Sequence, residues 1–310
     1  MKHGRISAGN ALHLARFIRE GHWDKASAAL LGAIKTAQTK NCERVLLSSE
    51  WLLGSFAHEN RLIEFDRLIQ KLGAYAFELL LVLRDPPGQF ISLYKHRAKS
   101  GSVPSIDKWA TSGYDLPIRL NSLRRQVAAA DVQLSVRGYD KKPGALERLF
   151  FEEWLAIPTP PQTSNALVNP SLSLSELVLL RKLRAHHEGL VPFFYERLLK
   201  IDPSEKCEGR AIQAHARLVA ENAVARHADE WRSWNALLQE EQRFEIPNPQ
   251  QSPGAEPKQL ELSEVQLSVM MKLLADATRP QLRWRLFWTY RLRPFLARNK
   301  RLLFPWHSRR

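Results

Sequence analysis

The residues of this chain best suited to chemistry lie where a strongly apolar run, residues 77–83, comes to an end. Arg84, Asp85 and Pro86 follow that run directly, and Ser92 comes about two turns into the helix that Pro86 is expected to begin. Ligands of open α/β sheets bind at the carboxyl ends of the strands, and a guanidinium matches a phosphate group. Arg84 and Ser92 are therefore candidates to bind one phosphate. The alternative is an ordinary surface ion pair between Arg84 and a neighbouring acid.

A second candidate is Glu50, which follows the short apolar run 44–48. A carboxylate at the end of a strand can orient an acceptor hydroxyl or remove its proton. Alternatively, Ser48, Ser49 and Glu50 simply begin the next helix as its caps. Arg137 and Asp140, after a later apolar run, are in turn either residues of the same cleft or an ordinary salt bridge.

The elements that must position these residues alternate between strands and helices. Short apolar runs predict three strands, and continuous runs of this kind are typical of parallel strands buried on both faces; the strands are expected at residues 44–48, 77–83 and 132–136. Helical spacing of apolar residues predicts helices at residues 8–38 with a break at Gly21, and at 62–72, 86–99, 114–130 and 146–155. This alternation predicts an α/β fold.

Beyond a linker rich in proline, threonine and asparagine, residues 157–170, the pattern is helical only. Ser173 with Glu176, and Ser263 with Gln266, have the spacing of capping boxes. One long helix is expected at residues 210–240 and a proline-rich loop at 244–258. We therefore expect three parts: an α/β core at 1–157, a helical region at 158–278 and a basic aromatic tail at 279–310.

Charge is concentrated in that tail. The chain has 46 basic and 32 acidic residues, and residues 279–310 hold nine arginines, one lysine and no acid, which leaves 36 basic residues in the rest. A mildly basic main body argues against a nucleic-acid-binding domain. In the tail, aromatic residues lie beside arginines, which suits an anionic membrane surface or a polyanionic acceptor. The two cysteines, Cys42 and Cys207, lack metal-ligand spacing, so we expect neither a disulfide framework nor a metal site, and a cytoplasmic protein.

The order and spacing of the motifs over about residues 5–155 resemble the sulfotransferases that use 3′-phosphoadenosine 5′-phosphosulfate. Residues 45–50, Val-Leu-Leu-Ser-Ser-Glu, resemble the strand that ends in Ser-Ser-Glu in bacterial members of that family. Residues 114–120 and 137–140 resemble the helix before that family's next strand and the segment after it. Arg84-Asp85-Pro86, together with Ser92, Tyr94 and Gly101, resembles the 3′-phosphate motif of the same family.

The resemblance implies a three-layer, parallel-sheet core of the P-loop sulfotransferase type. It implies that Arg84 and Ser92 bind the 3′-phosphate of the nucleotide co-substrate, 3′-phosphoadenosine 5′-phosphosulfate, and that no metal is needed. Glu50 is then the catalytic candidate. The expected reaction is sulfuryl transfer to a hydroxyl of a carbohydrate or related acceptor, in a bacterial cytoplasm or peripherally at the inner face of its membrane.

The chain departs from the family at its start. Those enzymes place a strand, a phosphate-binding loop of the Lys-Thr/Ser-Gly-Thr/Ser-Thr type and a helix first, and the loop holds the 5′-phosphosulfate. No such element precedes Asn10. We therefore expect an N-terminally truncated core that transfers poorly or not at all. The alternatives are a non-catalytic remnant, and an interaction protein that acts at a membrane surface through its basic tail.

Overall fold

The computed structural model describes residues 10–73, 75–98, 104–130, 132–140, 142, 144–159, 171–250 and 253–278. The chain divides into two compact units that interleave along the sequence. The first comprises residues 1–86, 114–168 and 227–246, and the second 87–113, 169–226 and 247–310. The division at residues 157 and 278 stays a prediction from the sequence, and the tail 279–310 lies outside the described residues.

The first unit begins with four helices that share one apolar core. They are α1 (Leu12–Glu20), α2 (Trp23–Thr39), α3 (Trp51–Phe56) and α4 (Arg61–Gly73). Ile18, Leu62 and Phe65 are completely buried in this core, and the rings of Phe56 and Phe65 lie 5.2 Å apart. The predicted break at Gly21 is confirmed: this residue has φ 72°, and its N–H caps the end of α1. Glycine adopts that left-handed conformation without steric cost.

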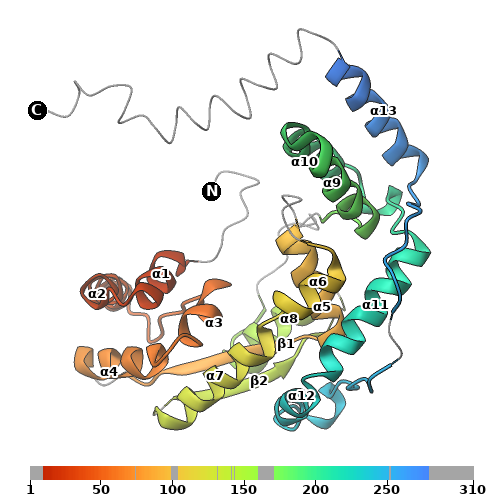
Figure 1. The fold of residues 1–310 in the computed structure, drawn as a ribbon. Coiled ribbons are helices and arrows are strands. Elements are labelled where there is room, and N and C mark those ends of the chain that lie inside the picture. The colour runs from red at the N-terminus through yellow and green to blue at the C-terminus, as the bar shows by residue number, and fades with distance from the viewer. Residues whose placement is uncertain are drawn as a thin grey trace, which may run out of the picture. The chain divides into compact units, whose positions relative to one another are not determined.

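The sheet of the first unit is a parallel pair, which confirms an α/β fold. β1 (Glu78–Leu83) pairs with β2 (Gln133–Gly138) (Figure 1). The register runs from Glu78 opposite Gln133 to Leu83 opposite Gly138. Both strands were predicted from their apolar runs. The chain between them forms α5 (Pro86–Arg97), α6 (Ile106–Ser112) and α7 (Leu116–Ala129). In the part of the chain that the structure describes, the sheet has these two strands, not those of a three-layer core. Most residues of β1 are half-buried rather than buried on both faces.

The strand predicted at residues 44–48 is wrong. Residues 44–49 form no strand, and Val45 and Leu46 are 41% and 37% exposed. The side chain of Asn10 binds this backbone instead: its Nδ2 donates to the Leu46 carbonyl at 2.8 Å, and its Oδ1 accepts from the Ser48 N–H at 2.7 Å. Leu47 packs against the helical core. The run is apolar, but an amide side chain takes the place that a neighbouring strand would have.

The remainder of the first unit contains α8 (Ala145–Arg148), a π-helix (Leu149–Trp154), α12 (Ala228–Asn235) and a 3₁₀ helix (Glu240–Gln242). The single helix predicted at 210–240 is wrong, because α11 (Arg210–Ala225) ends before α12 begins. Arg226 donates to the carbonyl of Ala110 in the second unit, and the ring of His227 packs on Tyr114 in the first. These tertiary contacts override a sequence of high helix propensity.

The second unit is helical, and its helices after residue 170 agree with the helical pattern predicted for that part of the chain. Besides α5, α6 and α11 it contains α9 (Leu174–His187), α10 (Val191–Leu199), α13 (Glu264–Thr278) and 3₁₀ helices at Glu188–Leu190 and Pro203–Glu205. None of the helices in the described residues is both long and apolar enough to cross a membrane.

Two capping boxes begin α9 and α13, as the sequence predicted, and they bind each other. Ser173 and Glu176 cap the start of α9, and Ser263 and Gln266 cap α13 in the same reciprocal way. The Gln266 Nε2 then donates to the Glu176 carboxylate at 2.9 Å, and the Lys206 ammonium lies 3.4 Å from the other carboxylate oxygen. Both Glu176 and Gln266 are completely buried, so this network joins two helix starts inside the core.

The segment that leads into α11 is held by the same helix starts. The Cys207 N–H donates to Gln266 at 3.1 Å, and the Glu208 carboxylate accepts from the Leu174 N–H at 2.9 Å. Gly209 follows with φ 74°, and a Cβ atom there would lie 2.5 Å from the Ser175 Oγ. The position therefore requires glycine for its conformation and for space.

Removal of the buried cation tests this network. In Lys206→Met the Glu176 carboxylate stays buried but loses its charged partner, so we expect the free energy of unfolding to fall by about 3 kcal/mol, at the lower end for breaking a buried ion pair. Urea unfolding followed by circular dichroism measures it. Lys200→Met, at an exposed position just after α10, is the matched control and should change stability by less than about 0.5 kcal/mol. Equal urea midpoints of unfolding for Lys206→Met and Lys200→Met would contradict the role of Lys206 as the partner of the buried Glu176 carboxylate.

Candidate functional site

The carboxyl edge of the sheet brings together residues that directly follow the two strands. Leu83 is the last paired residue of β1 and lies opposite Gly138 of β2. The Tyr139 N–H donates to the Leu83 carbonyl at 2.6 Å, which extends the ladder by one bond. Arg84 and Tyr139 therefore leave the sheet side by side. The sequence predicted Arg84 at the end of a strand, and the structure places it there.

The guanidinium of Arg84 lies over the ring of Tyr139, 5.3 Å from its centroid. This is cation–π geometry, which orients the arginine without neutralising its charge. Its Nε lies 4.0 Å from the Asp85 Oδ1, within ion-pair distance but too far for a hydrogen bond, so the surface ion pair that the sequence left open is present as a loose contact. The side chain is 37% exposed. Arg84 thus presents an oriented, accessible cation at the edge where α/β sheets bind their ligands.

Gly138 fixes the other strand end through a residue far away in the sequence. Its N–H donates to the Gln242 side chain at 2.9 Å, and an added Cβ would lie 2.9 Å from the Gln242 Cβ and 3.1 Å from its carbonyl oxygen. The 3₁₀ helix at Glu240–Gln242 therefore packs against the end of β2. Sequence reasoning missed Gln242, because no local signal links two residues 104 positions apart.

Arg137 and Asp140 make local contacts. The Asp140 carboxylate accepts from the Lys142 N–H at 3.0 Å, and the Lys142 ammonium lies 3.5 Å away. The backbone hydrogen bond from Lys142, followed by the charges of Lys142 and Arg148, lowers the pKa of Asp140. Arg137 donates to the carbonyl of Val136 at 3.0 Å. Asp140 therefore pairs with Lys142, and not with Arg137 as the salt bridge expected from the sequence would require.

Ser92 is exposed in the second turn of α5 and belongs to the second unit, whereas Arg84 belongs to the first. Convergence of the two side chains on one phosphate stays a prediction. Tyr94 of the same motif is buried: its hydroxyl donates to the Pro104 carbonyl at 3.2 Å and accepts from Arg181 at 3.3 Å. Burial raises the pKa of the Tyr94 hydroxyl. Gly101, the last residue of the motif, lies outside the described residues.

Glu50 directly precedes α3 and is exposed. The Ser49 Oγ accepts from the Trp51 N–H at 3.2 Å, so this serine caps the start of the helix. Ser49 therefore agrees with the alternative in which residues 48–50 begin the next helix. A catalytic role for Glu50 stays a prediction.

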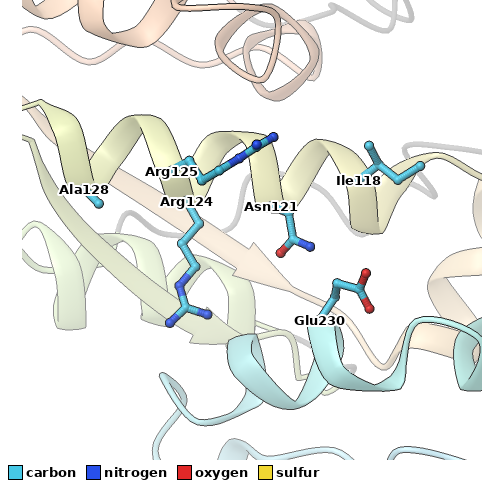
Figure 2. A pocket seen from close by; sticks show the side chains of 6 residues that line it. All are labelled: Ile118, Asn121, Arg124, Arg125, Ala128 and Glu230. Carbon is cyan, nitrogen blue, oxygen red and sulfur yellow. The ribbon is translucent and has the colours of Figure 1, made fainter.

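A hollow of about 610 Å³ lies elsewhere in the first unit, beside α7 and α12. Figure 2 shows Asn121 and Arg124 extending from α7 toward α12, and Glu230 extending back from α12. Glu230 has a partner in His227, whose Nδ1 lies 3.7 Å from its carboxylate. The lining contains none of the residues predicted from the sequence; it consists of Ile118, Asn121, Arg124, Arg125, Ala128 and Glu230. Among the described residues, no group of three histidine, cysteine or acidic side chains is placed to hold a metal ion.

Comparison of the chain with protein-family models, with characterised proteins and with solved structures finds no match. The function therefore has to be argued from the site itself.

The close contact at Gly138 generates a prediction. Gly138→Ala should lower the free energy of unfolding by about 1–3 kcal/mol, because the new methyl group overlaps Gln242 and pushes the 3₁₀ helix from the strand end. Gly189→Ala is the matched control, since a Cβ there meets nothing within 4 Å. Chemical unfolding of both variants measures the difference. If Gly138→Ala is as stable as Gly189→Ala, the strand end is not fixed in this way.

Proposed function

We propose that the protein is a sulfotransferase-like α/β protein that binds 3′-phosphoadenosine 5′-phosphosulfate at the carboxyl edge of its sheet. Arg84 binds the 3′-phosphate in this proposal, and Ser92 donates a second hydrogen bond to it. One observation carries the proposal: the Arg84 guanidinium is oriented by Tyr139 at the end of a parallel strand and its side chain is 37% exposed. An arginine fork recognises phosphate with two parallel hydrogen bonds.

The proposed reaction moves a sulfuryl group from the donor to a hydroxyl of a carbohydrate or related acceptor. The bond between the sulfur and the bridging oxygen breaks, adenosine 3′,5′-bisphosphate leaves, and the acceptor proton passes to a base, for which Glu50 is the candidate. The alternative is a non-catalytic protein that keeps the nucleotide site.

Binding of adenosine 3′,5′-bisphosphate tests the role of Arg84. Arg84→Ala should weaken binding by about 1.5–3 kcal/mol, the range for hydrogen bonds to a charged group. Isothermal titration calorimetry measures the affinity. Adenosine 5′-monophosphate is the comparison ligand: it lacks the 3′-phosphate, so it should bind the Arg84→Ala variant and the unsubstituted chain equally. Arg232→Ala, at an exposed arginine of α12, is the control variant. An equal loss for both ligands would show that Arg84 does not contact the 3′-phosphate.

An assay of labelled sulfate transfer to a panel of sugars distinguishes an active sulfotransferase from the non-catalytic nucleotide-binding protein. If the protein is an enzyme with Glu50 as its base, Glu50→Gln should lower the rate by about 10²–10⁴, because proton transfer in the transition state is lost, while nucleotide affinity stays unchanged. Glu59→Gln, at an exposed residue between α3 and α4, is the control. Nucleotide binding without turnover by the unsubstituted chain would favour the non-catalytic alternative.

A further inference from the structure

Helix α13 exposes a stripe of large apolar side chains. Leu267, Met271 and Leu274 are 47%, 67% and 44% exposed, and Met271 is the most exposed large apolar side chain in the described residues. Their spacing of four and three residues places them on one face of the helix. Gln266 and Leu273 are buried, so another face of the same helix already packs in the second unit. An exposed apolar stripe on a folded helix indicates a surface for interaction.

The chain that follows α13 supplies charge. Residues 279–310 contain nine arginines, one lysine and no acid, and among them stand Trp284, Trp288 and Trp306. Helix α13 itself carries Glu264, Lys272 and Asp276, and is close to neutral. An apolar stripe is therefore covalently continuous with a segment of ten positive charges. Such a combination is typical of segments that bind anionic lipid surfaces.

We propose that α13 and residues 279–310 together form a binding surface for an anionic phospholipid bilayer. The stripe Leu267, Met271 and Leu274 enters the boundary between headgroups and acyl chains, about 5–10 Å deep. The arginines and Lys300 bind the lipid phosphates and carboxylates. This inference is independent of the proposed nucleotide site, because none of its residues belongs to that site.

Charge favours lipid over the other occupants of such a stripe. A second copy that covered the stripe would bring another segment of ten positive charges close to the first, and like charges repel. A nucleic acid would neutralise the arginines but offers its phosphate backbone, which gives the apolar stripe nothing to pack against. An anionic bilayer neutralises the charges and buries the apolar side chains in the same contact.

Flotation of the full chain with vesicles tests the proposal. One vesicle is pure phosphatidylcholine, and the other contains phosphatidylcholine with about 30% phosphatidylserine, enough to attract basic segments. The chain should bind the anionic vesicle and bind the neutral one far more weakly. The triple variant Leu267→Ser, Met271→Ser, Leu274→Ser should lower the partition coefficient on anionic vesicles about 100-fold. This figure follows because the loss of each partly buried side chain should lower the coefficient about fivefold.

The matched control removes equally exposed apolar side chains from the first unit: Ile118→Ser, Leu146→Ser and Leu237→Ser, which are 59%, 45% and 45% exposed. This variant should bind vesicles as the unsubstituted chain does. The single variant Met271→Ser, at the most exposed position, should fold even if the triple variant does not, and should bind about fivefold more weakly.

Three results would overturn the proposal. Met271→Ser that binds anionic vesicles as tightly as the unsubstituted chain would exclude the stripe from the contact. Equal binding to neutral and anionic vesicles would exclude the charges. A dimer in sedimentation velocity that the triple variant converts to a monomer, with vesicle binding unchanged, would show that a second copy covers the stripe.

Discussion

The second unit depends on keeping one carboxylate satisfied away from water. Glu176 is completely buried, and a charge in that position is tolerated only with partners on its oxygens. Its partners come from three separate segments: the Ser173 N–H from the start of α9, the Gln266 amide from the start of α13, and the Lys206 ammonium from the segment before α11. The positions of these segments are therefore coupled, since movement of any one of them removes a partner from the buried carboxylate.

Local chemistry made part of the fold predictable. Both capping boxes were visible in the sequence because serine and an acid or amide three residues later satisfy helix N–H groups wherever they occur. Gly21 was predictable for the same reason, since its conformation depends on its own lack of a side chain. The sequence did not show that the two boxes bind each other. That contact joins Gln266 to Glu176 across 90 residues.

Predictions failed where tertiary partners decided the outcome. Residues 44–48 have the composition of a buried strand, but the amide of Asn10 binds their backbone. The candidate site divides in the same way. Arg84 was predictable as the residue after a strand, whereas Tyr139, which orients it, became visible only when the register of β1 and β2 placed the two strand ends together.

The interleaving of the two units has a consequence for synthesis on the ribosome. The chain passes between the units five times, at residues 86, 113, 168, 226 and 246, so neither unit exists as one continuous fragment. At about 5–20 residues per second, some 8–30 s separate the emergence of residue 86 from that of residue 246, which completes the first unit. The apolar β1 emerges before β2, the strand with which it pairs. Nascent chains of this protein therefore expose an unpaired apolar strand for seconds, the state that chaperones of translating ribosomes protect from aggregation.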